Sequence, residues 1–121
     1  MSRDCTDWVR RVFVPSIEAS PWRPLADVYR TPCGWLVKCE IAGVRPEDLT
    51  LTVRGSLLTI GGTRRDWCLE EGCSHYRLEI AYSHFERVLK LPCDLDRAEI
   101  STCYRDGLLH VTIRTEEGGQ R

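Results

Sequence analysis

The chain has 121 residues, of which 42% are apolar and 29% are charged, and its formal net charge is -1. This length fits one domain with its own core, and the composition excludes a wholly disordered chain. The near-zero charge disfavours nucleic acid as a partner, because nucleic-acid binding selects for a basic patch. No apolar run approaches the roughly 20 residues of a membrane span. The first residues also lack the apolar core of a signal peptide, so we expect a cytoplasmic protein without a membrane partner.

Residues 1–24 form a short arm with one apolar patch at helical spacing. Trp8 and Val12 are four residues apart, as are Val9 and Phe13. Residues four apart share one face of a helix. So short a helix is marginal alone in water, and the arm therefore needs a surface to pack against.

The middle of the chain alternates between apolar and other residues with a period of two. Residues 35–42 and 49–54 show it most clearly, and this period is typical of a half-buried strand. The same signature predicts further strands at residues 57–62, 75–82, 85–91, 98–105 and 108–114. In residues 75–82 the alternation places Tyr76, Leu78 and Ile80 on one face.

Turn residues separate these strands. Arg54-Gly55-Ser56 predicts a hairpin, and Asp106-Gly107 is a strong tight-turn pair. Many short strands with turns between them favour an all-β fold, an antiparallel immunoglobulin-like β-sandwich over residues 25–115. Residues 116–121 are a polar, glycine-containing tail.

Five motifs occur in an order that resembles a known family. They are Pro24-Leu25-Ala26-Asp27-Val28-Tyr29, Ile41-Ala42-Gly43-Val44, Leu57-Leu58-Thr59-Ile60-Gly61-Gly62, Phe85-Glu86-Arg87 before Leu91-Pro92, and Tyr104-Arg105-Asp106-Gly107-Leu108-Leu109. Together they resemble the alpha-crystallin domain of small heat-shock proteins over residues 24–115. Ala42 departs from the family pattern, which usually has proline there.

The resemblance implies an ATP-independent chaperone that binds partly unfolded proteins and limits their aggregation, with no enzyme activity and no cofactor. Such binding needs exposed apolar surface. We expect the client-binding side chains in the arm and in a groove between strands, at Trp8, Val9, Val12, Phe13, Leu51, Val53 and Val88. The alternative for the arm is that it packs on its own sandwich.

The resemblance also implies a homodimer or a small homo-oligomer. Residues 63–74 would carry an extra strand that adds to the sheet of a second copy, with Trp67 and Leu69 as apolar anchors. Arg87 matches a family arginine that forms ion pairs across the dimer interface. The alternatives are a surface loop and a solvated arginine. The family's I-x-I/V motif is missing after residue 115, which favours a small assembly.

The seven cysteines leave several hypotheses open. In a reducing cytosol the default is free thiols that behave as small apolar residues. Cys68, Cys73 and His75 offer three zinc-type ligands, but their spacing is not that of a zinc finger, so we expect no metal. A thiol switch at Cys68 and Cys73 is a further alternative.

No feature of the sequence indicates a catalytic site. The three histidines are far apart in sequence, and no known catalytic motif accompanies them. An adaptor resembling the CS-domain co-chaperones, which docks on one specific partner, is the other non-enzyme alternative.

Overall fold

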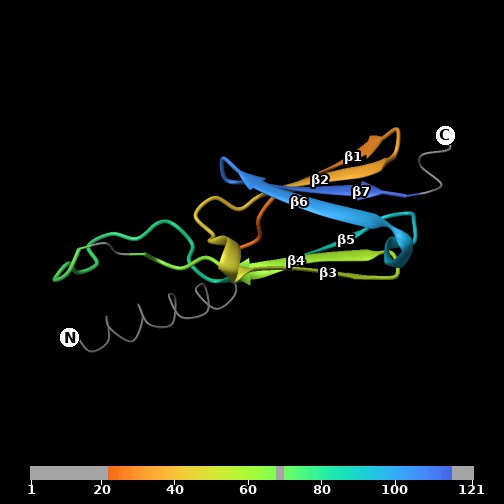
Figure 1. Ribbon diagram of the computed structural model, residues 1–121. Coiled ribbons are helices and arrows are strands. Elements are labelled where there is room, and N and C mark those ends of the chain that lie inside the picture. Colours follow the sequence, from red (N-terminus) through yellow and green to blue (C-terminus); the bar gives the residue numbers. More distant parts are fainter. Residues whose placement is uncertain (1–21, 68–69, 116–121) are drawn as a thin grey trace, which may run out of the picture.

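The computed structural model describes residues 22–67 and 70–115, and these residues form two antiparallel sheets packed face to face (Figure 1). The first sheet has the order β1-β2-β7-β6, with β1 Ala26–Thr31, β2 Gly34–Glu40, β7 Leu108–Arg114 and β6 Glu99–Arg105. The second has the order β3-β4-β5, with β3 Leu49–Arg54, β4 Leu57–Thr63 and β5 His84–Lys90. Two 3-10 turns, η1 Pro46–Asp48 and η2 Leu95–Arg97, precede β3 and β6. The expected β-sandwich is confirmed.

Alternate residues of the strands make the core between the sheets. Val37 and Cys39 of β2 and Leu58 and Ile60 of β4 are fully buried, whereas their neighbours in sequence face outward or are only partly covered. Period-two alternation places successive side chains on opposite faces, which is why each strand contributes every second residue to the core.

The predicted turn at Asp106-Gly107 is confirmed. Both residues have positive φ, 56° for Asp106 and 80° for Gly107, as a two-residue hairpin between β6 and β7 requires. Glycine suits the second position because it has no Cβ to clash in the left-handed region. The register of the hairpin then sets Leu109 opposite Tyr104.

The two sheets are stacked so that β5 of the second sheet lies on the same side of the sandwich as β1 of the first sheet. On the other side, β3 of the second sheet lies near β6 of the first. Nη1 of Arg87, on β5, donates a hydrogen bond of 2.7 Å to the carbonyl oxygen of Pro24, just before β1. On the other side, the N–H of Gly55 after β3 donates to Asp96 of η2, which leads into β6. Each sheet therefore presents an edge strand on both sides of the sandwich.

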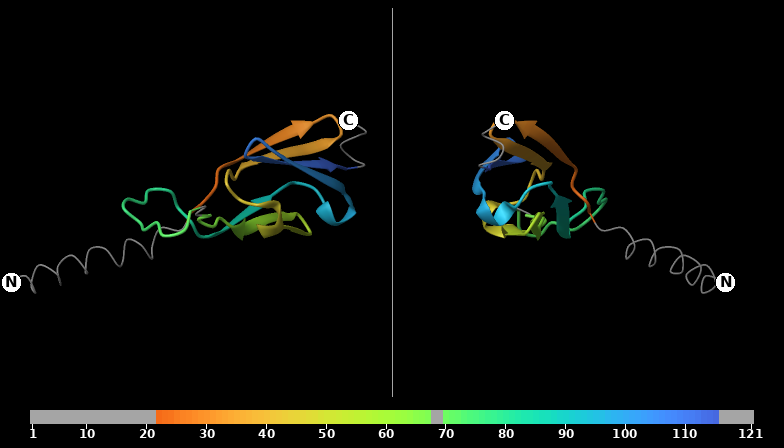
Figure 2. Two further views of the ribbon diagram at one scale, coloured as in Figure 1. Left: turned by 60° about the vertical axis from the view of Figure 1, so that its left-hand side comes forward. Right: turned by 90° about the vertical axis from the view of Figure 1, so that its right-hand side faces the viewer.

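The predicted strand at residues 75–82 is wrong for the isolated chain. None of these residues is in a strand, and all are exposed. The described part of the connection between β4 and β5 extends beyond the end of the sandwich (Figures 1 and 2). A strand needs a neighbouring strand to satisfy its N–H and C=O groups, and within residues 22–67 and 70–115 this segment has none.

Replacement of Ile60 by alanine tests the core. Ile60 is fully buried at the centre of β4, so Ile60→Ala removes packed methyl groups and leaves a cavity. We expect the free energy of unfolding to fall by about 2–5 kcal/mol in denaturant titrations. Thr59→Ala, at the adjacent outward-facing position, is the control and costs about 1 kcal/mol or less. Equal losses for the two variants would contradict this assignment of faces.

Candidate functional site

The segment between β4 and β5 carries several exposed large apolar side chains, including Tyr76, which is the most exposed one among the described residues. Tyr76 is 98% exposed, Leu78 57% and Ile80 60%, and we call these three residues the apolar strip. Residues 70–83, which carry it, are called the projecting segment. Between them Arg77 and Glu79 form an exposed ion pair at 3.5 Å. Exposed apolar side chains that gather on one surface often mark a contact site, so this strip is a candidate contact surface.

The root of the projecting segment is fixed by hydrogen bonds that continue the β4–β5 hairpin. The N–H of Arg64 donates to the carbonyl oxygen of Ser83 at 3.0 Å. The Thr63 hydroxyl and Nδ1 of His84 lie 2.6 Å apart in a hydrogen bond. The segment therefore leaves the sandwich from a closed base, while its apolar strip makes no core contact.

Two stacked side chains support this base from the side. The guanidinium of Arg64 lies 3.6 Å from the centre of the Trp22 ring. The Trp22 ring in turn meets Phe85 of β5 edge to face, with centroids 4.9 Å apart. Edge-to-face aromatic pairs and cation–π stacking are both favourable. Sequence reasoning assigned no such role to Arg64, because its partners are distant in sequence and follow no local period.

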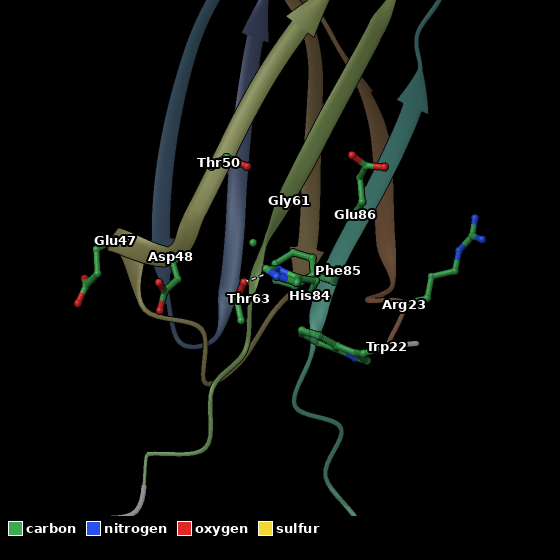
Figure 3. A pocket seen from close by; sticks show the side chains of 11 residues that line it. Trp22, Arg23, Glu47, Asp48, Thr50, Gly61, Thr63, His84, Phe85 and Glu86 are labelled. Carbon is green, nitrogen blue, oxygen red and sulfur yellow. Dashed lines mark hydrogen bonds between the residues drawn. The ribbon is translucent and has the colours of Figure 1, made fainter. Parts of the chain in front are cut away.

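A pocket lies beside Trp22 at the same end of the three-stranded sheet (Figure 3). Its lining includes Trp22, Arg23, Glu47, Asp48, Thr50, Gly61, Gly62, Thr63, His84, Phe85 and Glu86. A Cβ at Gly62 would clash with the carbonyl oxygen of Asp48, so the backbones approach closely there. Asp48 is paired with Arg65 at 3.2 Å, and His84 with Thr63. Because both groups are occupied by their own chain, we assign no chemistry to this pocket.

The three groove residues expected from the sequence do not share one surface. Leu51 and Val53 lie on the inward face of β3, partly buried against the core. Val88 lies on the outward face of β5 and is 50% exposed. The register pairs Val88 with Thr59 and then Thr52, whereas Leu51 aligns with Ile60. The expectation that Val88 lines a groove with Leu51 and Val53 is therefore wrong, because adjacent strand residues face opposite ways.

Arg87 lies on the inward face of β5, on the side of β1. Nη1 bonds to Pro24, but Nε is buried and has no hydrogen-bond partner in the described chain. A buried guanidinium nitrogen without a partner is costly. Beside it β1 is an edge strand, with Val28 42% and Tyr29 43% exposed. This side of the sandwich therefore has an open backbone edge and an unsatisfied cation donor together.

The remaining predicted contact residues fall in different places. Trp67 is 44% exposed, and its ring lies under the guanidinium of Arg45, 3.5 Å from the ring centre. This stacking holds Trp67 against its own chain. The predicted residues that lie outside the described part of the chain are Trp8, Val9, Val12, Phe13 and Leu69.

The cysteines differ from one another in state. Cys73, in the projecting segment, is disulfide-bonded, so the expectation of free thiols throughout is wrong. Cys33, Cys39 and Cys103 carry free thiols. Burial raises the pKa of the Cys39 thiol, the charge of Arg87 lowers it and that of Glu40 raises it further. Among the described residues no group of three potential ligands is arranged to hold a metal ion.

Within residues 22–67 and 70–115 there is no helix with the length and apolar character needed to cross a membrane.

Comparison with known proteins gives consistent matches. Residues 27–121 match the model of the Hsp20/alpha crystallin family. Small heat shock protein C2 of Rickettsia felis is 27% identical over 97 residues, which cover 80% of this chain and 63% of that protein. Alpha-crystallin of Mycobacterium tuberculosis is 35% identical over 83 residues, which cover 68% of this chain and 55% of that protein. The chain therefore spans less than two thirds of the length of both relatives.

Solved structures show the same fold. Heat shock protein 16.0 from Schizosaccharomyces pombe superposes with a TM-score of 0.69 at 28% identity, covering 83% of this chain and 93% of the solved one. HSP18.5 from E. histolytica superposes with a TM-score of 0.63 at 24% identity, covering 78% and 88%.

Thiol labelling tests the burial of Cys39. The folded protein should react with an alkylating reagent at exposed Cys33 and not at Cys39, because burial removes access and disfavours the reactive thiolate. Peptide mass mapping locates the label, and a sample unfolded in denaturant is the control in which both positions react. Equal labelling of Cys39 and Cys33 in the folded protein would contradict the placement of Cys39 in the core.

Proposed function

Because the chain belongs to the Hsp20/alpha crystallin family, we propose that it is a chaperone that holds partly unfolded proteins without ATP and limits their aggregation. This family consists of chaperones and not enzymes, so the expectation that the chain is not an enzyme is confirmed by its membership. Work in the cytoplasm, expected from the sequence, remains a prediction.

The observation that carries the proposal is accessible apolar surface on a stable sandwich. The edge strand β3 has its inward side chains Leu49, Leu51 and Val53 only partly buried, and Ile100 on β6 is likewise partly buried. We call these four residues the edge strip. Burial of apolar area contributes roughly 25 cal/mol per Å² of favourable free energy to binding. This contribution does not depend on the client's sequence, so it is available to any client with exposed apolar groups. Such contacts favour broad, weak binding over recognition of one sequence.

We also propose that the chain forms a homodimer by strand addition, with the projecting segment of one copy on the β1 edge of the other. The apolar strip alternates Tyr76, Leu78 and Ile80, the pattern of a strand with one covered face. An added strand would satisfy the open backbone edge of β1. This moves the exchanged strand from the sequence prediction at residues 63–74 to residues 75–82.

The surroundings of Arg87 also support adding the partner's strand at the β1 edge. The buried Nε of Arg87 has no partner among the described residues, and it lies next to the edge that would receive the second copy. A carboxylate from the partner would complete the guanidinium fork with a charge-assisted hydrogen bond. Trp67, which is stacked on Arg45, would flank this contact and not anchor it.

Client protection can be tested on the edge strip. Light scattering from a heat-stressed model client should fall when the chain is added at near-equimolar ratio without ATP. We expect Leu51→Thr with Val53→Thr to weaken this protection several-fold, because the strip loses apolar area while strand propensity is kept. Thr50→Ser with Thr52→Ser, on the opposite face of β3, is the matched control. Protection by the edge-strip variant equal to the control, or none by the native chain in excess, would count against the proposal.

Sedimentation analysis can test the dimer. The double variant Leu78→Glu with Ile80→Glu introduces two charges at positions that are exposed in the single chain, so the chain should still fold. The dimer should be lost, because the proposed interface would bury both charges without partners. Arg77→Ser with Glu79→Ser, at the alternate positions, is the control and should remain dimeric. A native chain that sediments as a monomer, or a double-glutamate variant that still dimerises, would refute strand addition through this segment.

A further inference from the structure

Arg64 follows β4 directly, and its side chain joins three separate parts of the chain. Nε donates to the carbonyl oxygen of Ala81 at 2.8 Å, and Nη1 donates to that of Ala42 at 3.2 Å. The guanidinium plane stacks on Trp22. One side chain therefore connects the end of the projecting segment, the turn after β2 and the residues that lead into β1.

We propose that Arg64 is the positioning residue for dimer formation, because it fixes the direction in which the projecting segment leaves the sandwich. This inference rests on the proposed strand addition and names the residue that prepares the segment for it. Without Arg64, the described residues at the closed base would keep the backbone bond to Ser83, the bond between Thr63 and His84, and a bond of 3.5 Å from the backbone N–H of Trp22 to the Ser83 hydroxyl. None of these bonds reaches Ala42.

The guanidinium is suited to this task by its shape. It is planar and carries donors in a fixed fork, so it can bond to Ala81 and Ala42 while its face stacks on Trp22. A lysine would keep the charge but offers a single ammonium point, which cannot hold two separated carbonyl oxygens and stack at once. Fixing a binding segment in advance strengthens association because fewer conformations are lost on binding.

Arg65 provides a matched control at the next position. Its Nε bonds to the carboxylate of Asp48 at 3.2 Å, and its side chain is 54% exposed. Asp48 belongs to η1, so this bond ties Arg65 to the sandwich and not to the projecting segment. Substitution of Arg65 removes the same charge one residue away and leaves the contacts of Arg64 intact.

The experiment compares Arg64→Ala, Arg64→Lys and Arg65→Ala in the full chain by analytical ultracentrifugation. We expect the dimer dissociation constant to rise roughly tenfold for both Arg64 variants and to stay within about twofold for Arg65→Ala. The failure of lysine to restore affinity would show that the fork, and not the charge, is needed.

Measuring the stability of the monomer shows whether Arg64 positions the projecting segment or is needed for the fold in general. Arg64→Ala is also placed in the Leu78→Glu, Ile80→Glu background, and its unfolding midpoint is compared with that background alone. We expect a small shift, because the contacts of Arg64 lie at the surface. Equal dissociation constants for Arg64→Ala and Arg65→Ala would overturn the role of Arg64 alone, as would a loss of monomer stability as large as the loss of affinity. A native chain that is monomeric at all concentrations would overturn strand addition and this inference together.

Discussion

The alternation of apolar residues along β2, β4 and β7 is the constraint on which the rest of the structure depends. It buries Val37, Ile60 and Val111 between the two sheets and leaves no side chain able to change face without exposing the core. Once the faces are fixed, the edges are fixed too: β1 and β6 bound one sheet, and β3 and β5 the other. Every candidate contact surface follows from these edges or from the segment that joins β4 to β5.

The sequence predicted the strands well because strand periodicity is a local property. Residues 49–54 form β3 as expected, and Asp106-Gly107 forms the expected hairpin turn. Residues 75–82 show the same period but no strand, since periodicity reports which face is apolar and not whether a neighbouring strand exists. The period is present in the sequence, but no neighbouring strand pairs with this segment among the described residues.

The candidate site was less predictable because its parts meet over long sequence distances. The contact of Arg64 with Trp22, and its bond to Ala42, leave no trace in local spacing. The error at Val88 is of another kind. A period of two within the predicted strand 85–91 puts Phe85, Arg87 and Leu89 on one face and Val88 on the other, and this could have excluded Val88 from the groove.

A segment that forms a strand only with a second molecule loses conformational entropy when it binds. Fixing the backbone costs about 1–2 kcal/mol per residue, so ordering residues 75–82 from a free state would cost about 8–16 kcal/mol. The apolar strip and the hydrogen bonds of an added strand must offset that cost before any affinity remains. Anchoring the base through Arg64 reduces the number of residues left to order, while Tyr76, Leu78 and Ile80 stay accessible. A fixed base with an exposed strip is therefore better suited to reversible association than a wholly free loop or a strand already paired within its own chain.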